Sequence, residues 1–169
     1  MTLTVGTNSY VSEADATTYF ETRIDSSNWT SATTANKEAA LVTATQLIDN
    51  NAWIGYAVSS TQALAWPRKE AVYWDNRLQL EITFTSSETP DLVKTAVYEQ
   101  ALHFIDNEDL LQGKTQTYES ISVGSISLSD SNNDVGRTSI TPAYIMKPLR
   151  PLIRRGVNVG MGTSWWRSN

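Results

Sequence analysis

The sequence predicts a mainly α-helical protein with a small β component: a bundle of about four helices, a β-hairpin or strand pair, and an extended C-terminal tail. Three observations support this fold class. Apolar residues recur at helical spacing in four segments, they alternate with polar residues in two shorter ones, and the last residues combine glycines with two adjacent tryptophans. A chain of 169 residues can bury a core as one domain. We therefore expect a single domain over residues 1–155 and a tail over residues 156–169.

The first two helices are expected near residues 12–24 and 34–50. Ser12 can cap the first helix, and Asp15 stands at the position that completes a capping box. The apolar positions are Ala16, Tyr19, Phe20 and Ile24 in the first helix and Ala40, Leu41, Ala44, Leu47 and Ile48 in the second. We expect the two helices to form an antiparallel hairpin that buries Tyr19 and Phe20 against Leu41 and Leu47.

Two further helices are expected near residues 90–111 and 142–154. Pro90 suits the first position of a helix, and a broad apolar face indicates that this helix is central to the core. Its apolar residues are Leu92, Val93, Ala96, Val97, Ala101, Phe104 and Ile105. Pro148 and Pro151 lie inside the last apolar segment, so that helix is expected to be short, kinked or broken into turns.

Strands are expected near residues 78–84 and 118–129, where apolar and polar residues alternate. In the second segment Ile121 and Val123 occupy odd positions, whereas Ile126 and Leu128 occupy even ones. Because side chains alternate between the two faces of a strand, a bulge or a tight bend is needed at Gly124. This segment is therefore expected to be a pair of strands.

Trp66, Pro67 and Arg68 form a short motif between the second and third predicted helices. Proline fixes its own φ and pushes the preceding residue into an extended conformation, which holds the Trp66 ring at a defined angle. We interpret the motif as a core anchor, in which Trp66 fills the core and Arg68 is a solvated or paired cation.

Charge is unevenly distributed along the chain. Residues 135–169 contain six basic residues and no acidic one, whereas residues 1–134 contain seven basic and eighteen acidic residues. A basic C-terminal arm on an acidic body suggests an arm that binds a negative surface, either protein or nucleic acid. The simpler alternative is a solvated helix end whose cations complement the helix dipole.

The composition disfavours several classes of function. With no cysteine and His103 as the single histidine, the chain lacks the residues for a cysteine zinc site, thiol catalysis or a multi-histidine metal centre. No glycine elbow or phosphate loop accompanies the carboxylates. We therefore expect no catalytic, cofactor-binding or metal-binding residues. No apolar stretch approaches the length of a membrane span, so no membrane contact is expected.

The tail contains Trp165, Trp166 and Arg167 after a glycine-rich stretch. It could fold back on its own domain, remain disordered, or become ordered on a partner. We favour the last possibility, because exposed Trp and Arg dominate interface energetics.

The order of several motifs resembles that of the head-tail connector (adaptor, head-completion) proteins of tailed bacteriophages. These belong to a group often labelled putative DnaT-like single-stranded-DNA-binding proteins. The resemblance covers most of residues 8–155 and rests on the order and spacing of its parts: Asn8 to Ala16, Tyr19-Phe20, Lys37 to Leu41, Gln62 to Arg68, Pro90 with Val93, Lys94 and Ala96, and Ser120 to Ser127. Two features depart from the pattern: residues 71–89 have more strand character, and the Trp165-Trp166 tail has no counterpart.

The resemblance implies a structural virion protein, made in the host cytoplasm, that forms a dodecameric adaptor ring in the neck and extends the DNA channel. Its partners would be the portal protein, a stopper or tail-completion protein, further copies of itself, and double-stranded DNA that passes through the lumen without specific binding. The portal-docking residues would be Ile145, Leu149, Arg150, Leu152, Ile153, Arg154, Arg155, Trp165, Trp166 and Arg167. The inter-subunit or channel strands would contain Ile121, Val123, Gly124, Ile126 and Leu128.

A single-stranded-DNA-binding primosomal accessory protein is the alternative that the group label suggests. Such a protein should combine a basic track with exposed aromatic side chains on which bases stack. In this sequence the basic residues concentrate near the C-terminus, and periodicity assigns most aromatic residues to the core. These two features favour the adaptor interpretation at the level of sequence.

Overall fold

The computed structural model describes residues 2–75, 77–107, 110, 121–123, 126–128 and 140–154. Its α-helices are α1 (Glu13–Glu21), α2 (Ser27–Ser31), α3 (Thr34–Asp49), α4 (Asp91–Asp106) and α5 (Ala143–Leu149), and a 3-10 turn, η2 (Arg150–Leu152), follows α5. Its strands are β1 (Tyr56–Ala57), β2 (Arg68–Lys69), β3 (Val72–Asp75), β4 (Leu80–Thr83), β5 (Ile121–Val123) and β6 (Ile126–Leu128). The predicted mainly helical fold class with a small β component is confirmed.

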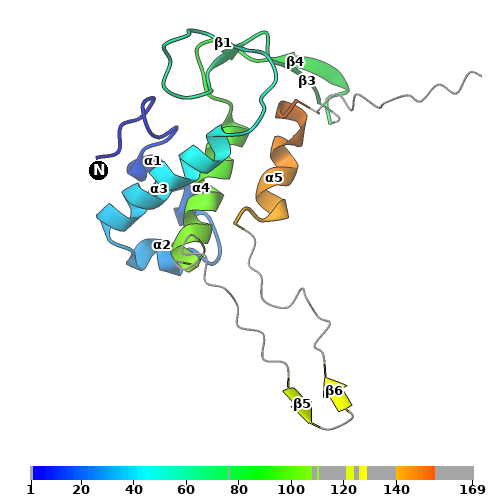
Figure 1. Cartoon of the computed structure of the whole chain (residues 1–169). Coiled ribbons are helices and arrows are strands. Elements are labelled where there is room, and N and C mark those ends of the chain that lie inside the picture. Colours follow the sequence, from blue (N-terminus) through cyan, green and yellow to red (C-terminus); the bar gives the residue numbers. More distant parts are fainter. Residues whose placement is uncertain are drawn as a thin grey trace, which may run out of the picture.

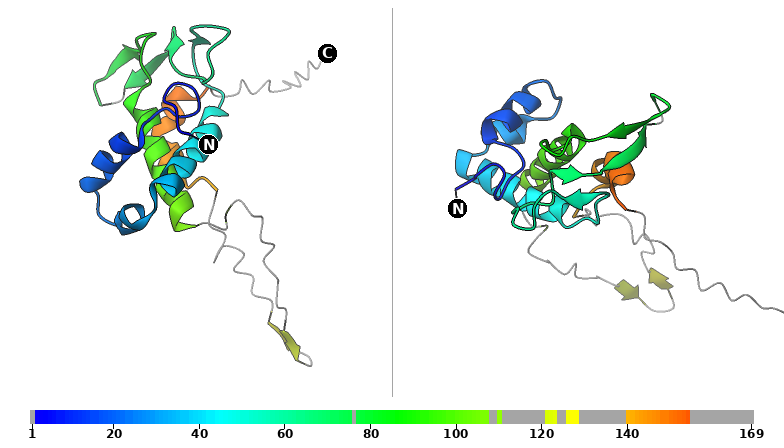
Figure 2. Two further views of the ribbon diagram at one scale, coloured as in Figure 1. Left: turned by 90° about the vertical axis from the view of Figure 1, so that its left-hand side faces the viewer. Right: turned by 90° about the horizontal axis from the view of Figure 1, so that it is seen from above.

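Helix α4 occupies the centre of the bundle, with α3 on one side and α5 on the other (Figure 1). The β1–β2 and β3–β4 pairs cover one end of the helices (Figure 2). The side chains that are almost completely buried come from all of these helices: Phe20, Trp29, Leu41, Ile48, Val93, Val97, Ile145 and Leu149, together with Leu152 of η2. The core is therefore continuous from α1 to η2.

Local sequence signals explain where several helices begin. The Ser12 hydroxyl accepts a hydrogen bond from the Asp15 amide, and the Asp15 carboxylate accepts one from the Ser12 amide, so the predicted capping box is present. At α3, the Thr33 hydroxyl accepts from the Asn36 amide at 3.2 Å. Pro90 precedes α4 and leaves no amide group without a partner at that position.

Two predicted helix ends differ from the structure. Helix α1 ends at Glu21 instead of residue 24, and the Ile24 side chain is 89% exposed even though it continues the apolar period. Asp25, with φ of +64°, turns the chain at this point. Helix α4 ends at Asp106 instead of residue 111, because the Asn107 side chain bonds to the carbonyl of His103 and the backbone leaves the helical conformation.

The short helix α2 was not predicted. The sequence around Trp29 indicates a polar connection with a hydrophobic stop, but the Trp29 ring is buried against Phe20, with ring centroids 4.7 Å apart. Its indole N–H donates to the Thr17 hydroxyl at 3.2 Å. Burial of the large Trp29 side chain stabilises this single helical turn, whose residues have little helix propensity of their own.

The predicted α1–α3 hairpin is not the main helix pair. Helix α3 packs most extensively against α4, and its contact with α1 is smaller. Phe20 and Leu41 are buried as expected, but the Tyr19 ring stacks on Tyr98 of α4, with centroids 4.8 Å apart. The apolar face of α4 is broad enough to contact α2, α3 and α5, which explains its central place.

The predicted strand near 78–84 is β4, and its partner is β3. Trp74 and Asp75 of β3 pair with Glu81 and Leu80. Leu78 and Leu80 are 46% and 45% exposed. The helices cover only one end of this hairpin, so the apolar face of its other end stays exposed.

The predicted strand pair near 118–129 is present as the antiparallel strands β5 and β6. Val123 pairs with Ile126, so the two paired segments are separated by two residues in the sequence. The predicted bulge or tight bend falls on those two residues, which lie outside the described part of the chain. Gly124 itself lies outside the described residues. No helix among the described residues is both long and apolar enough to cross a membrane.

Candidate nucleic-acid interface

The fold brings basic residues from two distant segments together. Residues 152–154 run beside residues 52–54: the Ile54 amide donates to the Leu152 carbonyl at 2.9 Å, and the Arg154 amide donates to the Ala52 carbonyl at 2.6 Å. Trp53 and Ile153 form an antiparallel bridge between these hydrogen bonds. The pairing places Arg154 next to Arg68 of β2.

Arg68 is built into the fold by backbone carbonyls. Its guanidinium donates to the carbonyls of Ile54, Gly55 and Ala65 at 2.7, 2.8 and 3.2 Å. Partial burial lowers the Arg68 pKa, and the charge of Arg154 acts in the same direction. Within the described part of the chain, neither Arg68 nor Arg154 forms a salt bridge with a carboxylate. The two guanidinium groups therefore make an electropositive site.

An exposed aromatic ring completes this site. Tyr56 pairs with Lys69 across the β1–β2 ladder, and its side chain is 56% exposed. The residues around the resulting open pocket are Asn51, Ala52, Trp53, Gly55, Tyr56, Ala57, Ala65, Arg68 and Arg154. Gly55 has φ of +69°, and a Cβ atom there would lie 2.6 Å from the Lys69 carbonyl oxygen, so this close approach of β1 and β2 requires glycine.

A buried polar network holds the Gln62–Arg68 segment under the pocket. The Asp49 carboxylate accepts hydrogen bonds from the Tyr10 hydroxyl and from the Ala65 amide, and the Tyr10 hydroxyl accepts one from the Trp66 amide. Burial and the bond to Asp49 raise the pKa of Tyr10 far above its ordinary value. The network fixes the backbone of the Trp66-Pro67-Arg68 motif, whose first peptide bond is cis.

The Trp66-Pro67-Arg68 motif, interpreted from the sequence as a core anchor, lies between the core and the pocket. Trp66 is 2% exposed and contacts Trp53 and Phe84 edge to face, with centroids 5.8 and 5.6 Å away. Arg68 is the paired cation, although its partners are carbonyl groups instead of a carboxylate. In this motif Trp66 thus fills the core, and Arg68 lines the pocket.

The predicted portal-docking residues divide into buried and exposed groups. Ile145, Leu149 and Leu152 are at most 2% exposed, because α5 and η2 use them to pack on the protein's own core. Arg150 and Arg154 are exposed, and Ile153 is half-buried. Only the exposed residues can contact a partner without displacing α5. Arg155, Trp165, Trp166 and Arg167 lie outside the described residues, as does Gly124 of the predicted inter-subunit strands.

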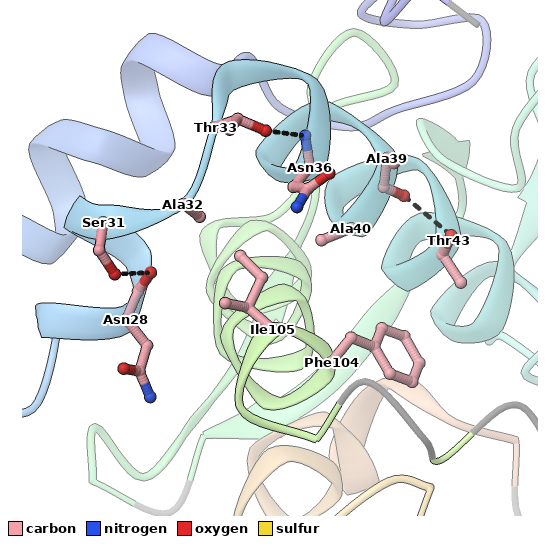
Figure 3. Close-up of a pocket in the computed structure, with 10 residues that line it drawn as sticks. All are labelled: Asn28, Ser31, Ala32, Thr33, Asn36, Ala39, Ala40, Thr43, Phe104 and Ile105. Carbon is pink, nitrogen blue, oxygen red and sulfur yellow. Dashed lines mark hydrogen bonds between the residues drawn. The ribbon is translucent and has the colours of Figure 1, made fainter.

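A second surface is a groove between α2, α3 and the end of α4 (Figure 3). Its residues are Asn28, Ser31, Ala32, Thr33, Asn36, Ala39, Ala40, Thr43, Phe104 and Ile105. None of them is charged, and several of their polar groups are occupied by local hydrogen bonds, such as that from the Thr43 hydroxyl to the Ala39 carbonyl at 2.8 Å. The groove therefore offers no attraction for phosphate.

The carboxylate of Glu99 on α4 is the most deeply buried acid of the described core, at 6% exposure. It accepts hydrogen bonds from the Tyr19 hydroxyl and from the Arg23 guanidinium, the latter at 2.9 Å. Burial and the hydrogen bond from the Tyr19 hydroxyl to Glu99 raise the Tyr19 pKa to about 12. Arg23 compensates the charge of Glu99. The contacts of Glu99 with Tyr19 and Arg23 therefore form a structural link between α1 and α4. No group of His, Asp and Glu residues that could hold a metal ion occurs among the described residues.

From the sequence, Arg68 is expected to belong to the core anchor, and Arg150 and Arg154 to the portal-docking residues. The sequence does not predict that Arg68 and Arg154 lie at one pocket, nor does it single out Tyr56 or Lys69. Tyr56 belongs to an aromatic-rich stretch, yet nothing in its spacing distinguishes an exposed ring from a buried one. The signal that could have helped is Gly55, a residue type that permits a close backbone approach beside an aromatic residue.

A protein-family model described as "Putative DnaT-like ssDNA binding protein" matches residues 2–166. This description agrees with the group label that accompanies the sequence resemblance and does not mention a head-tail connector. No curated protein matches, and no solved structure matches.

Proposed function

Since the chain belongs to the family described as putative DnaT-like ssDNA-binding proteins, we propose that it binds single-stranded DNA through the basic site at β1, β2 and η2. The observation that carries the proposal is the proximity of Arg68 and Arg154 at one pocket, with Lys69 in the adjoining β1–β2 ladder. Arg150, exposed at the start of η2, precedes Arg154 by four residues. The family description supports this function over the adaptor function that the sequence alone favours.

The distribution of charge defines how a strand would bind. Phosphate groups are attracted to clustered Arg and Lys, and most of the affinity of such sites comes from release of counterions. Helix α1 carries acidic side chains at Glu13, Asp15 and Glu21, which disfavour phosphate on that part of the surface. With about three or four phosphates neutralised, the logarithm of the binding constant should fall with log salt with a slope of about −2 to −3.

Fluorescence anisotropy with a labelled oligothymidylate tests the proposal. The full chain and the variant Arg150→Glu are titrated at several salt concentrations, and Lys94→Glu, at a half-buried α4 cation paired with Asp91, is the matched control. We expect Arg150→Glu to weaken binding severalfold and to make the salt slope shallower, while Lys94→Glu has little effect. Absence of salt-dependent binding by the unmodified chain, or equal weakening by both variants, contradicts the proposal.

The phage neck adaptor is a second candidate, favoured by a different observation. The β3–β4 hairpin exposes Val72 and Trp74 on one face, at 41% and 52%, and Leu80 on the other face, at 45%. Exposed apolar surface is typical of protein interfaces. As the sequence resemblance implies, such a chain would form a ring, dodecameric in size, between the portal and a stopper or tail protein, within the neck of the virion. The acidic body suits a channel through which double-stranded DNA slides without adhering.

Co-sedimentation with portal rings from the same genome distinguishes the two candidates. The full chain is compared with a chain that ends at Arg155, with single-stranded DNA tested in parallel. Portal binding that is lost with the tail supports the adaptor. Salt-sensitive DNA binding without portal binding supports the DNA-binding function and excludes the adaptor function.

A further inference from the structure

We propose that the pocket at Tyr56, Arg68 and Arg154 is a subsite for a single unpaired nucleotide, which places its phosphate at the two guanidinium groups and its base on the Tyr56 ring. This inference rests on the proposed function and names the unit of the strand that the basic site recognises. It also predicts why single-stranded DNA is preferred over duplex.

The phosphate position follows from the state of the two arginines. Arg68 uses three of its N–H groups on the carbonyls of Ile54, Gly55 and Ala65, which fixes the plane of the guanidinium and leaves further N–H groups for a ligand. The Arg154 backbone is fixed by its hydrogen bond to Ala52, and its exposed side chain has no ion pair with the described residues. Two adjacent cations without a carboxylate between them bind a phosphate oxygen favourably.

Asp49 is the acidic residue that acts electrostatically on Arg68, but its carboxylate does not occupy the anion position in the pocket. Its carboxylate oxygen Oδ1 already accepts hydrogen bonds from the Tyr10 hydroxyl and the Ala65 amide. These bonds belong to the network that supports the pocket from the core. The cations that line the pocket therefore remain available to an outside anion.

The base position follows from Tyr56. Tyr56 is more than half exposed, lies in a two-residue strand opposite Lys69, and is one of the residues that surround the pocket with Arg68 and Arg154. An exposed aromatic face next to a phosphate site is the arrangement on which bases of single strands stack, and stacking tolerates any base. In a duplex both faces of each base are covered by neighbours, so the ring has no free base to contact.

A chemical double-mutant cycle tests the subsite. Binding of oligothymidylate and of an abasic strand with the same number of phosphates is measured for the full chain, Tyr56→Leu and Tyr56→Phe. We expect Tyr56→Leu to weaken oligothymidylate binding about fivefold, the low end of base–aromatic stacking. The abasic strand should bind the full chain and Tyr56→Leu equally, and Tyr56→Phe should retain the unmodified affinity.

Arg154→Ala provides the second arm. It should weaken both strands by a similar factor and make the salt slope shallower by about 0.7, the value for one lost phosphate contact on a single strand. Thermal melts followed by circular dichroism verify that each variant is folded. If Tyr56→Leu weakens the abasic strand as much as oligothymidylate, or weakens neither, the subsite is wrong while the DNA-binding function stands. If the full chain binds neither strand at low salt, the proposed function fails together with the subsite.

Discussion

At the residue scale, buried aromatic side chains stabilise the part of the fold that contains the β1–β2 and β3–β4 pairs. Trp66 is enclosed by Trp53 and Phe84, and the amides around it bond to Tyr10 and Asp49. The sequence identifies Trp66 as an anchor because proline restricts its backbone. Its partners lie in separate segments, so only the structure reveals which rings meet.

Replacement of Trp66 by Ala should destabilise the protein by about 3–5 kcal/mol, because a large cavity remains at a site with little freedom to collapse. Trp74→Ala is the matched control: the same side chain is removed from a position that is 52% exposed, and the cost should be about 0.5 kcal/mol or less. Urea unfolding measures both values. Equal costs for the two variants contradict the assignment of Trp66 as the anchor.

The tyrosines of the α1–α4 contact predict a loss of stability at high pH. Burial, followed by the hydrogen bond to Glu99 for Tyr19 and by the charge of Asp15 for Tyr98, raises the pKa of each to about 12 from the ordinary value of 10.0. Between these values the unfolded chain releases protons that the folded protein retains, so stability is constant below pH 10 and falls from pH 10 to 12.

Urea midpoints measured from pH 8 to 12 check this expectation. Tyr98→Phe removes one of the titrating groups and should make the fall shallower. A stability that stays level across this range, or that rises with pH, contradicts the raised pKa values.

At the scale of elements, local signals and tertiary contacts contribute differently to each helix. Helices α3 and α4 begin close to the predicted positions, because the Thr33 cap marks the start of α3, Pro90 marks the start of α4, and each has a long apolar period. Helix α2 exists because Trp29 is buried, and β3 exists because it pairs with β4. Neither has a local pattern strong enough to predict it.

Helix α5 has one face in the core and one in solvent, which separates stability from binding. Leu149→Ala should cost about 2–5 kcal/mol, since this side chain is completely buried. Lys147→Ala, on the exposed face of the same helix, should leave stability within about 0.5 kcal/mol. Chemical denaturation compares the two. A large loss in Lys147→Ala would show that the outer face also packs on the protein.

At the scale of the whole molecule, the chain from Ala52 to Ile54 and the chain from Leu152 to Arg154 hold the β end to the last helix. This contact closes the fold between segments that are far apart in sequence. It also defines where the folded body can be shortened, because Arg154 makes the last hydrogen bond among the described residues.

A chain that ends at Arg155 should therefore keep the helix content and melting temperature of the full chain. A chain that ends at Pro151 loses Leu152, which is completely buried, and the hydrogen bonds to Ile54 and Ala52, so its melting temperature should fall by several degrees. Circular dichroism measures both. If the chain that ends at Arg155 is unfolded, residues 156–169 belong to the folding unit.

The sequence by itself determined the helical class, the approximate span of the longer helices, the capping box at Ser12, and the concentration of basic residues near the C-terminus. These properties depend on neighbours within a few residues, so local periodicity and side-chain chemistry are sufficient to predict them. Only the tertiary structure decided that Ile145, Leu149 and Leu152 are buried while Arg154 lies beside Arg68 and Tyr56. Burial and proximity of this kind depend on which faces of distant segments meet, and that choice minimises the free energy of the whole chain.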